Sequence, residues 1–177
     1  MNPPPMTIRE LTDRDWPEVD AIQRLSYPPA AVENLDALRC HARLSPTTCL
    51  AAEAAGRLLG YVLAHPWPHR QMPPLNTVYA AIPARADSLY LHDLTTAPAA
   101  RGRGVATALV RVLFAEALRL GCTSSSLLAV QDAPGFWARF GYGEAPAVTL
   151  QFQPAFHRIF PGLAFRYMEL ELRRATA

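Results

Sequence analysis

Residues 94–106 read Leu94-Thr95-Thr96-Ala97-Pro98-Ala99-Ala100-Arg101-Gly102-Arg103-Gly104-Val105-Ala106 and join an alternating, strand-like segment (88–95) to the longest helical pattern (104–120). Glycine lets a backbone approach a ligand closely, and the first N–H groups of a helix have no partner inside it. Arg101 and Arg103 add guanidinium groups that can make forked contacts with phosphate. The turn therefore predicts an anion site, suited to a pyrophosphate, at the positive end of a helix dipole. The alternative is a tight turn whose arginines are merely solvated.

Outward from this turn, strand patterns alternate with helical ones. Helices are expected over 13–26, 34–44, 104–120 and 133–140, and strands over 7–11, 48–54, 58–63, 88–95, 125–130, 148–153 and 164–172. The hairpin at 48–63 is antiparallel, whereas the later strand–helix alternation implies parallel pairing. We therefore predict an α/β (α+β) fold, in which helices cover both faces of one mixed sheet of six to seven strands and a central strand leads into the turn.

The length of 177 residues, half of them apolar, indicates a single domain over 1–177. Residues 1–5 are proline-rich and are expected to form a flexible tail. Residues 65–85 contain five prolines and are expected to form an irregular loop. A loop of this length inside a compact domain is usually functional or disordered.

The charge balance excludes several functional classes. The 17 basic residues are all arginine, against 15 acidic residues, so we expect no large basic surface for nucleic acid. Without lysine, neither a Schiff base nor the lysine-containing phosphate loop of nucleotide hydrolases is possible. Three cysteines without a C-x-x-C pair indicate neither a disulfide framework nor a zinc site. Because no signal peptide and no membrane-length apolar run is evident, we expect a soluble, cytoplasmic protein with no membrane partner.

The turn lacks the third glycine of the dinucleotide fingerprint G-x-G-x-x-G, because Thr107 stands in its place. It resembles instead the acetyl-CoA motif of the GCN5-related N-acetyltransferase (GNAT) superfamily, Gln/Arg-x-x-Gly-x-Gly/Ala. Arg101, Gly104 and Ala106 occupy the fixed positions of that motif. A second region, 133–142, resembles the later helix of the family and its Gly-Phe/Tyr turn. The resemblance covers roughly residues 6–172.

Residues 91–96, Leu91-His92-Asp93-Leu94-Thr95-Thr96, are similar to the strand of arylalkylamine N-acetyltransferases, which carries H-x-L-x-V at this place. Short segments at 27–29, 38–46 and 60–62 also resemble the N-terminal half of that branch. This finer resemblance favours a primary amine as the acceptor, without naming one.

The GNAT resemblance implies acetyl-CoA as co-substrate and no metal. It implies that the strand after residue 93 splays from its neighbour and offers backbone groups to the pantetheine arm, while the turn holds the pyrophosphate. Backbone N–H groups at the open strand edge would then polarise the thioester carbonyl. The implied cofactor-binding residues are Leu94, Thr95, Thr96, Arg101, Gly102, Arg103, Gly104, Val105, Ala106 and Phe136.

An alkyl amine with a pKa near 10.4 is neutral in only about one molecule in two thousand at pH 7, so a base must remove its proton. His92 is the first candidate, because the ordinary pKa of histidine suits the task and its position resembles that of the catalytic histidine of the branch. Asp93 is the second candidate. On a regular strand the two side chains point to opposite faces, so we expect only one of them at the site. The alternative for His92 is a hydrogen-bonded histidine on a half-buried strand.

Trp137 stands where many relatives have a tyrosine that protonates the departing thiolate. The general acid is therefore open: Tyr142 is a possible substitute, or the thiolate leaves unaided. Tyr27 and Trp67 are candidates for walls of an amine-binding pocket, because aromatic faces suit a ring or an ammonium group. The alternative is that both simply cover the core.

We therefore expect an acetyl-CoA-dependent N-acetyltransferase acting on the primary amine of a small molecule by direct attack on the thioester. Two alternatives stay open: acetylation of a protein or peptide amine, and an acyl-CoA-binding protein that has lost turnover. A homodimer is left open as well. Fold resemblance alone does not fix the reaction.

Overall fold

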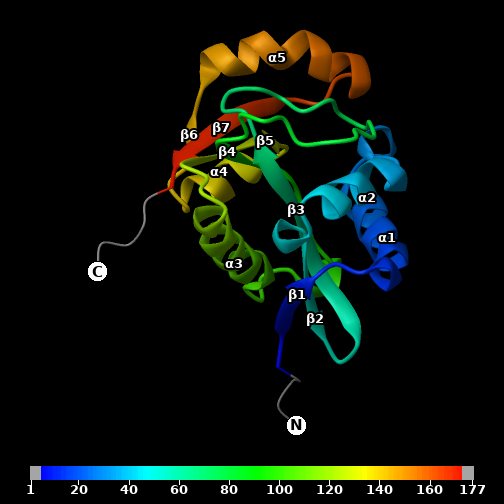
Figure 1. Ribbon diagram of the computed structural model, residues 1–177. Helices are drawn as coiled ribbons and strands as arrows, with labels where there is room; N and C mark the ends of the chain where they lie inside the picture. The colour runs from blue at the N-terminus through cyan, green and yellow to red at the C-terminus, as the bar shows by residue number, and fades with distance from the viewer. Residues whose placement is uncertain (1–4, 173–177) are drawn as a thin grey trace.

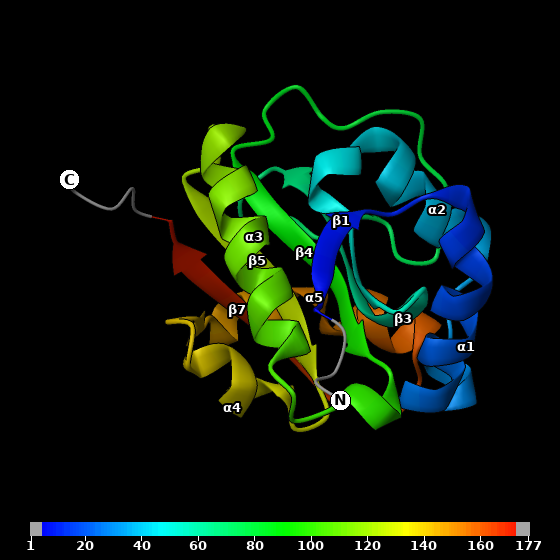
Figure 2. The same cartoon turned by 90° about the horizontal axis from the view of Figure 1, so that it is seen from below.

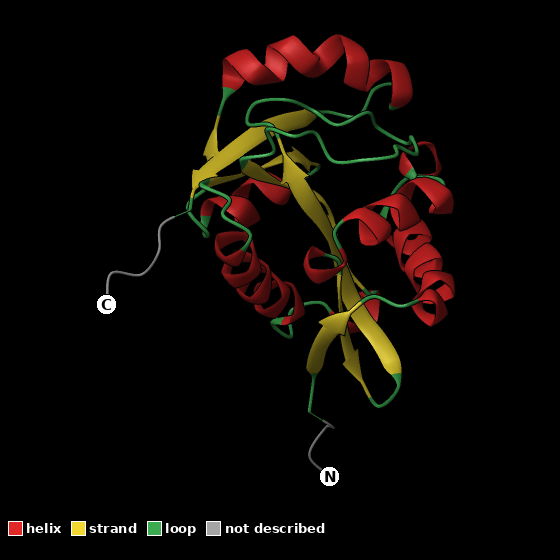
Figure 3. Ribbon diagram, in the orientation of Figure 1, coloured by secondary structure: helices red, strands yellow, loops and turns green. Residues whose placement is uncertain are grey.

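A seven-stranded mixed sheet runs through the part of the chain that the computed structural model describes, residues 5–172 (Figure 1; Figure 3). Residues 1–4 of the expected tail lie outside the described residues. The strand order is β1-β2-β3-β4-β5-β7-β6, with β4 and β5 parallel and the other neighbours antiparallel. The strands are β1 (Thr7–Glu10), β2 (Leu50–Ala54), β3 (Arg57–Trp67), β4 (Ser88–Thr96), β5 (Ser124–Val130), β6 (Gly143–Glu144) and β7 (Phe165–Glu171).

Helices cover both faces of the sheet, as the sequence predicts. Figures 1 and 2 show α1 and α2 on one face, α3 and α4 on the other, and α5 across the end formed by β6 and β7. The helices are α1 (Trp16–Ser26), α2 (Leu35–Leu44), α3 (Val105–Arg119), α4 (Ala133–Ala138) and α5 (Pro146–Ile159). Within residues 5–172, no helix combines the length and the apolarity that a bilayer crossing needs.

Successive side chains of a strand point to opposite faces of the sheet, so apolar residues form a hydrophobic core on each face. In β2, Leu50 and Ala52 pack toward α3, whereas Ala51 packs toward α1 and α2. A third cluster joins α5 to β7, with Phe152, Phe156 and Tyr167 among its members. The sheet is therefore buried on both sides along its centre, which fixes the positions of the two central strands.

The long helix α3 begins where the sequence predicts. Gly104 precedes it with φ +79°, a left-handed conformation that glycine adopts without steric cost. Val105, Leu109 and Leu113 form its fully buried stripe. Gly121, with φ +82°, follows its end.

The pairing between β4 and β5 stops halfway along the two strands. Their register runs from Ser88 opposite Ser124 to Leu91 opposite Leu127, yet β4 continues to Thr96 and β5 to Val130. Beyond Leu91 the edge of β4 that faces β5 has no neighbouring strand. The sheet therefore opens at its centre, beside the start of α3, as the family resemblance implies.

The expectation of a strand over 148–153 is wrong, because these residues lie in α5. Val148, Phe152 and Phe156 are buried at a helical spacing of four, and Pro146 occupies the first turn, where its missing N–H costs nothing. The seventh strand is instead the two-residue β6, which pairs with β7.

The loop expected over 65–85 begins later than predicted. β3 continues to Trp67, and Pro66 pairs with Leu89 of β4. Pairing between β2 and β3 ends at Val62, so the last residues of β3 form an edge, where a proline is tolerated. The irregular segment is 68–87.

Candidate active site

A groove of about 460 Å³ lies at the N-terminus of α3. The first backbone hydrogen bond of the helix runs from the N–H of Ala108 to the carbonyl of Gly104, at 3.0 Å, so the N–H groups before it have no partner inside the helix. A Cβ built on Gly102 or Gly104 would meet nothing within 4 Å, which means that the turn faces open space. The predicted cofactor residues that line this groove are Leu94, Thr96, Arg101, Gly102, Gly104, Val105, Ala106 and Phe136.

The other two predicted cofactor residues lie differently. The Thr95 side chain is buried on the opposite side of β4, where its hydroxyl donates to Asp93 at 3.0 Å. Arg103 is exposed and does not line the groove. Arg139 does line it, with its guanidinium carbon 5.1 Å from the centre of the Phe136 ring. Arg139 was missed, although it lies in the second motif region, 133–142.

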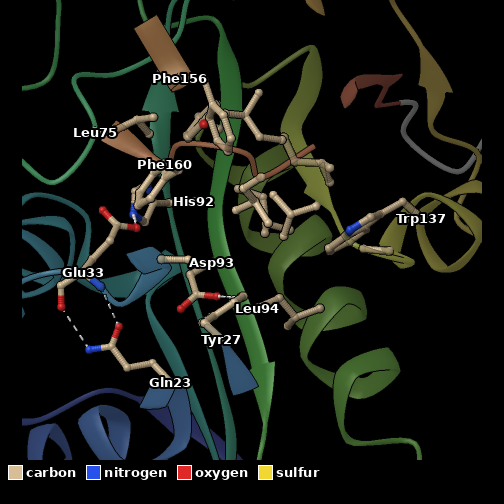
Figure 4. Close-up of a pocket in the computed structure, with 18 residues that line it drawn as sticks. Gln23, Tyr27, Glu33, Leu75, His92, Asp93, Leu94, Trp137, Phe156 and Phe160 are labelled. Atoms are coloured by element: carbon tan, nitrogen blue, oxygen red, sulfur yellow. Dashed lines mark hydrogen bonds and ion pairs between the residues drawn. The ribbon is translucent and has the colours of Figure 1, made fainter. Parts of the chain in front are cut away.

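A second hollow, the cavity, encloses about 120 Å³ where β4 and β5 separate (Figure 4). The groove and the cavity share the walls Leu94, Ala133 and Trp137. The cavity floor carries His92 and Asp93 from β4. Its apolar walls and roof are Leu75, Leu127, Leu128, Val130, Phe156, Phe160 and Leu163.

His92 and Asp93 both face the helix α1 and α2 side, contrary to the expectation from a regular strand. Leu63 pairs with Asp93 and Ala64 with Leu91, so His92 is an extra residue, a β-bulge that interrupts the alternation. The bulge brings both side chains to the cavity. No local sequence pattern predicts this bulge, because a bulge depends on how two strands pair.

Asp93 accepts three hydrogen bonds. The hydroxyls of Tyr27, Tyr61 and Thr95 donate to its carboxylate at 2.6, 2.7 and 3.0 Å. Burial raises the pKa of Asp93, although the tyrosine hydroxyls and nearby His92 oppose the rise. Tyr27, one of the two predicted substrate-binding residues, thus lines the cavity and is also hydrogen-bonded to Asp93.

His92 is paired with an acidic residue that sequence reasoning missed. Its Nε2 lies 2.9 Å from Oε1 of Glu33, and its side chain is 2% exposed. Burial alone would lower the pKa of His92, but the charge and hydrogen bond of Glu33 outweigh it and the pKa is raised. The pKa of Glu33 is lowered, because the effect of His92 outweighs burial. Figure 4 shows the pair on the side of the cavity away from Trp137.

Comparison with known proteins bears on what this arrangement does. A family model described as "Acetyltransferase (GNAT) family" matches residues 6–142. The chain belongs to the GNAT acetyltransferase family. Membership predicted from the turn and the 133–142 region is thereby confirmed, and the chain is an acetyltransferase. The arylalkylamine branch stays a prediction.

Solved structures of low identity share the fold. Ard1 from Thermoplasma volcanium is 15% identical, with a TM-score of 0.71 over 96% of this chain and 99% of that one. A GNAT acetyltransferase from Brucella melitensis, in complex with acetyl-CoA, is 20% identical, with a TM-score of 0.60 over 98% and 92%. Arabidopsis thaliana Naa50, in complex with the bisubstrate analogue CoA-Ac-MVNAL, is 11% identical, with a TM-score of 0.67 over 94% and 98%. A search of curated proteins finds no match.

Trp137, expected from the resemblance to stand where many relatives have a tyrosine, lies in the wall between the groove and the cavity and is 5% exposed. The substitute considered from sequence, Tyr142, lines neither hollow. Its hydroxyl lies 2.6 Å from that of Ser125, and burial raises its pKa. Tyr142 is thus a packed core residue.

Trp67 does not line the cavity either. It is 8% exposed and packs edge-on against His65, with its ring centre 5.3 Å from that of Tyr79. This position fits the alternative of a core-covering side chain. Among residues 5–172, no three His, Cys, Asp or Glu side chains are arranged to hold a metal ion.

Proposed function

We propose that this GNAT acetyltransferase moves the acetyl group of acetyl-CoA to the primary amine of a small molecule. The observation that carries the proposal is the junction of two hollows at the separation of β4 and β5. One is a groove at a helix N-terminus with arginines, and the other is a smaller, mostly apolar cavity with a buried histidine. The two substrates would meet at Leu94, in the wall that both hollows share.

The groove suits the diphosphate of coenzyme A. Unpaired N–H groups at the start of α3 and the positive end of its dipole favour an anion there. Arg101 lines the same groove and can add a charge-assisted contact, and Arg139 offers another. Acetyl-CoA supplies an activated acyl thioester, and the unpaired backbone edge of β4 would donate to the carbonyl oxygen as negative charge develops.

His92 is the better of the two candidate bases. The carboxylate of Asp93 is already occupied by Tyr27, Tyr61 and Thr95, which leaves little capacity for an incoming ammonium proton. His92 lines the cavity and its Nδ1 has no hydrogen-bond partner. A positioned general base contributes about 10²- to 10⁴-fold to such a step.

The small size of the cavity favours a small acceptor over a peptide. An apolar cavity of about 150 Å³ is known to hold benzene, so about 120 Å³ accommodates an apolar body of roughly that size or smaller. Phe156 and Phe160 close the side toward α5. The peptide alternative rests on Naa50, whose structure holds a CoA–peptide bisubstrate analogue.

Release of free thiol from acetyl-CoA, measured with a panel of small primary amines and with short peptides, tests the proposal. We expect turnover with compact apolar amines and none above background with peptides. Turnover with peptides but with no small amine would show that the acceptor is a peptide and not a small molecule. Tight acetyl-CoA binding in calorimetry with no thiol release from any amine or peptide would instead favour a non-catalytic acyl-CoA-binding protein.

A further inference from the structure

We infer that Glu33 is a positioning residue: it keeps the hydrogen of neutral His92 on Nε2 and so leaves Nδ1 as the atom that takes the acceptor's proton. This inference rests on the proposed function, in which His92 is the base. In the step concerned, one N–H bond of the acceptor ammonium breaks and one N–H bond forms on Nδ1. The lone pair left on the amine is then free to attack the thioester carbonyl.

Two segments hold Glu33 in place. The side chain of Gln23 in α1 spans its backbone, donating to the carbonyl and accepting from the N–H, both at 3.1 Å. The backbone N–H of Asn76, in the 68–87 segment, donates to the second carboxylate oxygen at 3.1 Å. Oε1 is thus directed at His92, and Figure 4 shows the Gln23 contacts beneath the pair. A carboxylate held this firmly is suited to orienting another side chain.

The hydrogen bond decides the tautomer. A carboxylate only accepts, so the Nε2 facing Glu33 carries hydrogen, and the other nitrogen of a neutral imidazole then presents a lone pair. That nitrogen, Nδ1, is buried without a partner. Among the described residues, the other buried side-chain polar atoms without a partner are in Trp67, Ser88 and Tyr167, none of which lines the cavity. The unsatisfied acceptor therefore belongs to a residue that borders the substrate space.

The groups behind His92 do not compete for the proton. Nδ1 of His65 faces the carbonyl of Pro66 at 3.1 Å and must donate, so the Tyr79 hydroxyl donates to Nε2 of His65 at 2.7 Å. Nδ1 of His41 then donates to the Tyr79 oxygen at 2.9 Å. Burial lowers the pKa of His65 to about 4 and lowers that of His41 further. His41 is thus a neutral ring whose centre lies 4.0 Å from that of His92.

The pH dependence follows from every titratable group packed around His92: Glu33 between α1 and α2, His41 in α2, His65 in β3, and Tyr90 and Asp93 in β4. The two other histidines are neutral, and burial keeps Tyr90 protonated. Glu33 is the largest influence that favours the charged form of His92. Neutralising Glu33 therefore lowers the pKa of His92, whereas a residue needed only for folding would not move it.

The test combines nitrogen NMR of histidine with rate measurements on the full chain. In the wild type, above the His92 pKa, we expect the spectrum of an Nε2–H tautomer. Glu33→Gln, whose amide can donate as well as accept, should lower the His92 pKa and mix the tautomers. It should also move the acid limb of kcat/KM to lower pH and reduce the plateau by about 10²-fold or more. Asp36→Asn, which removes an exposed carboxylate three residues away, should change none of these.

A wild-type His92 that carries hydrogen on Nδ1 would overturn the inference without any variant. It would also fall if Glu33→Gln raised KM for the amine while leaving the His92 titration and the acid limb unchanged, because Glu33 would then bind the ammonium directly. If the wild type neither bound acetyl-CoA nor released thiol from it, the proposed function would fail instead. The tautomer is read in the free protein, so the two failures are distinguishable.

Discussion

His92 and Asp93 are adjacent and both buried, yet their polar atoms are satisfied to different degrees. Asp93 joins β4 to Tyr27 at the end of α1 and to Tyr61 in β3. His92 has one partner, Glu33, and one nitrogen without any. Buried polar groups are normally hydrogen-bonded, so an exception on a residue that lines a cavity calls for a functional explanation. At the residue scale, therefore, we propose that Asp93 stabilises the candidate site and that His92 is its base.

Replacing His92 by glutamine should remove the base and leave the groove intact. We expect kcat/KM for the amine to fall by about 10²- to 10⁴-fold near pH 8, since general-base help is worth that much. The affinity for acetyl-CoA, measured by calorimetry, should not change. His157→Gln in α5 is the matched control, because that histidine lines neither hollow. Unaltered turnover of the His92 variant would rule out this base.

Replacing Asp93 by asparagine should act mainly on stability. The amide has one oxygen in place of two and brings N–H donors toward hydroxyls that themselves donate. We expect the free energy of unfolding in urea to fall by about 1–3 kcal/mol. Tyr27→Phe, which removes one of the three donors, should cost less. If Asp93→Asn unfolded like the wild type but lost turnover as completely as the His92 variant, Asp93 would be the base.

At the scale of elements, the approach of β3 to β4 shapes the groove. A Cβ built on Gly60 would lie 2.8 Å from the backbone oxygen of Thr95, an atom that cannot move without shifting β4. Gly60→Ala should lower the free energy of unfolding by about 1–3 kcal/mol and weaken acetyl-CoA binding, because Leu94 and Thr96 line the groove. Gly143→Ala is the control, since a Cβ there meets nothing within 4 Å. Full stability and affinity in the Gly60 variant would contradict this close approach.

The attachment of β1 to the segment before α1 should govern acid stability. Burial alone would raise the pKa of Asp15, but hydrogen bonds from Arg9 and Thr12 bring it to about 2. The pKa of an aspartate in the unfolded chain is about 3.9, so the lowered pKa of Asp15 stabilises the fold at pH values above that. This contribution is about 2 kcal/mol, and it is lost as the pH falls from about 5 toward 2. When the free energy of unfolding is measured against pH, Asp15→Asn should flatten the curve between about pH 5 and pH 2. Asp13→Asn, which changes an exposed side chain, should leave the curve unchanged. Equal acid sensitivity of both variants would contradict the assignment.

Elements with a local cause were predictable, and those set by pairing were not. The start of α3 follows from Gly104 and the apolar stripe after it, both visible in the sequence. The strand edge at Pro66 depends on where β2 stops, and the bulge at His92 depends on the register with β3. In α5, a short alternation of apolar residues suggested a strand, although the longer spacing of four was helical.

At the scale of the whole molecule, the open centre of the sheet brings the two hollows together. The turn 101–106 could be predicted as part of the candidate site because its chemistry lies in one short stretch. Glu33 could not, because it meets His92 from 59 residues away, through contacts that only the packing of α1 and α2 on the sheet creates. The local half of the site was therefore visible in the sequence, and the long-range half was not.

The central claim is that the groove at the start of α3 binds acetyl-CoA, and calorimetric titration of the full chain with acetyl-CoA tests it most directly. We expect one site per chain, weakened roughly 10- to 100-fold by Arg101→Ala, because a hydrogen bond to a charged group is worth about 1.5–3 kcal/mol. Arg158→Ala in α5, a helix whose residues do not line the groove, should leave the affinity unchanged. Absence of binding by acetyl-CoA or any other CoA derivative would contradict the account.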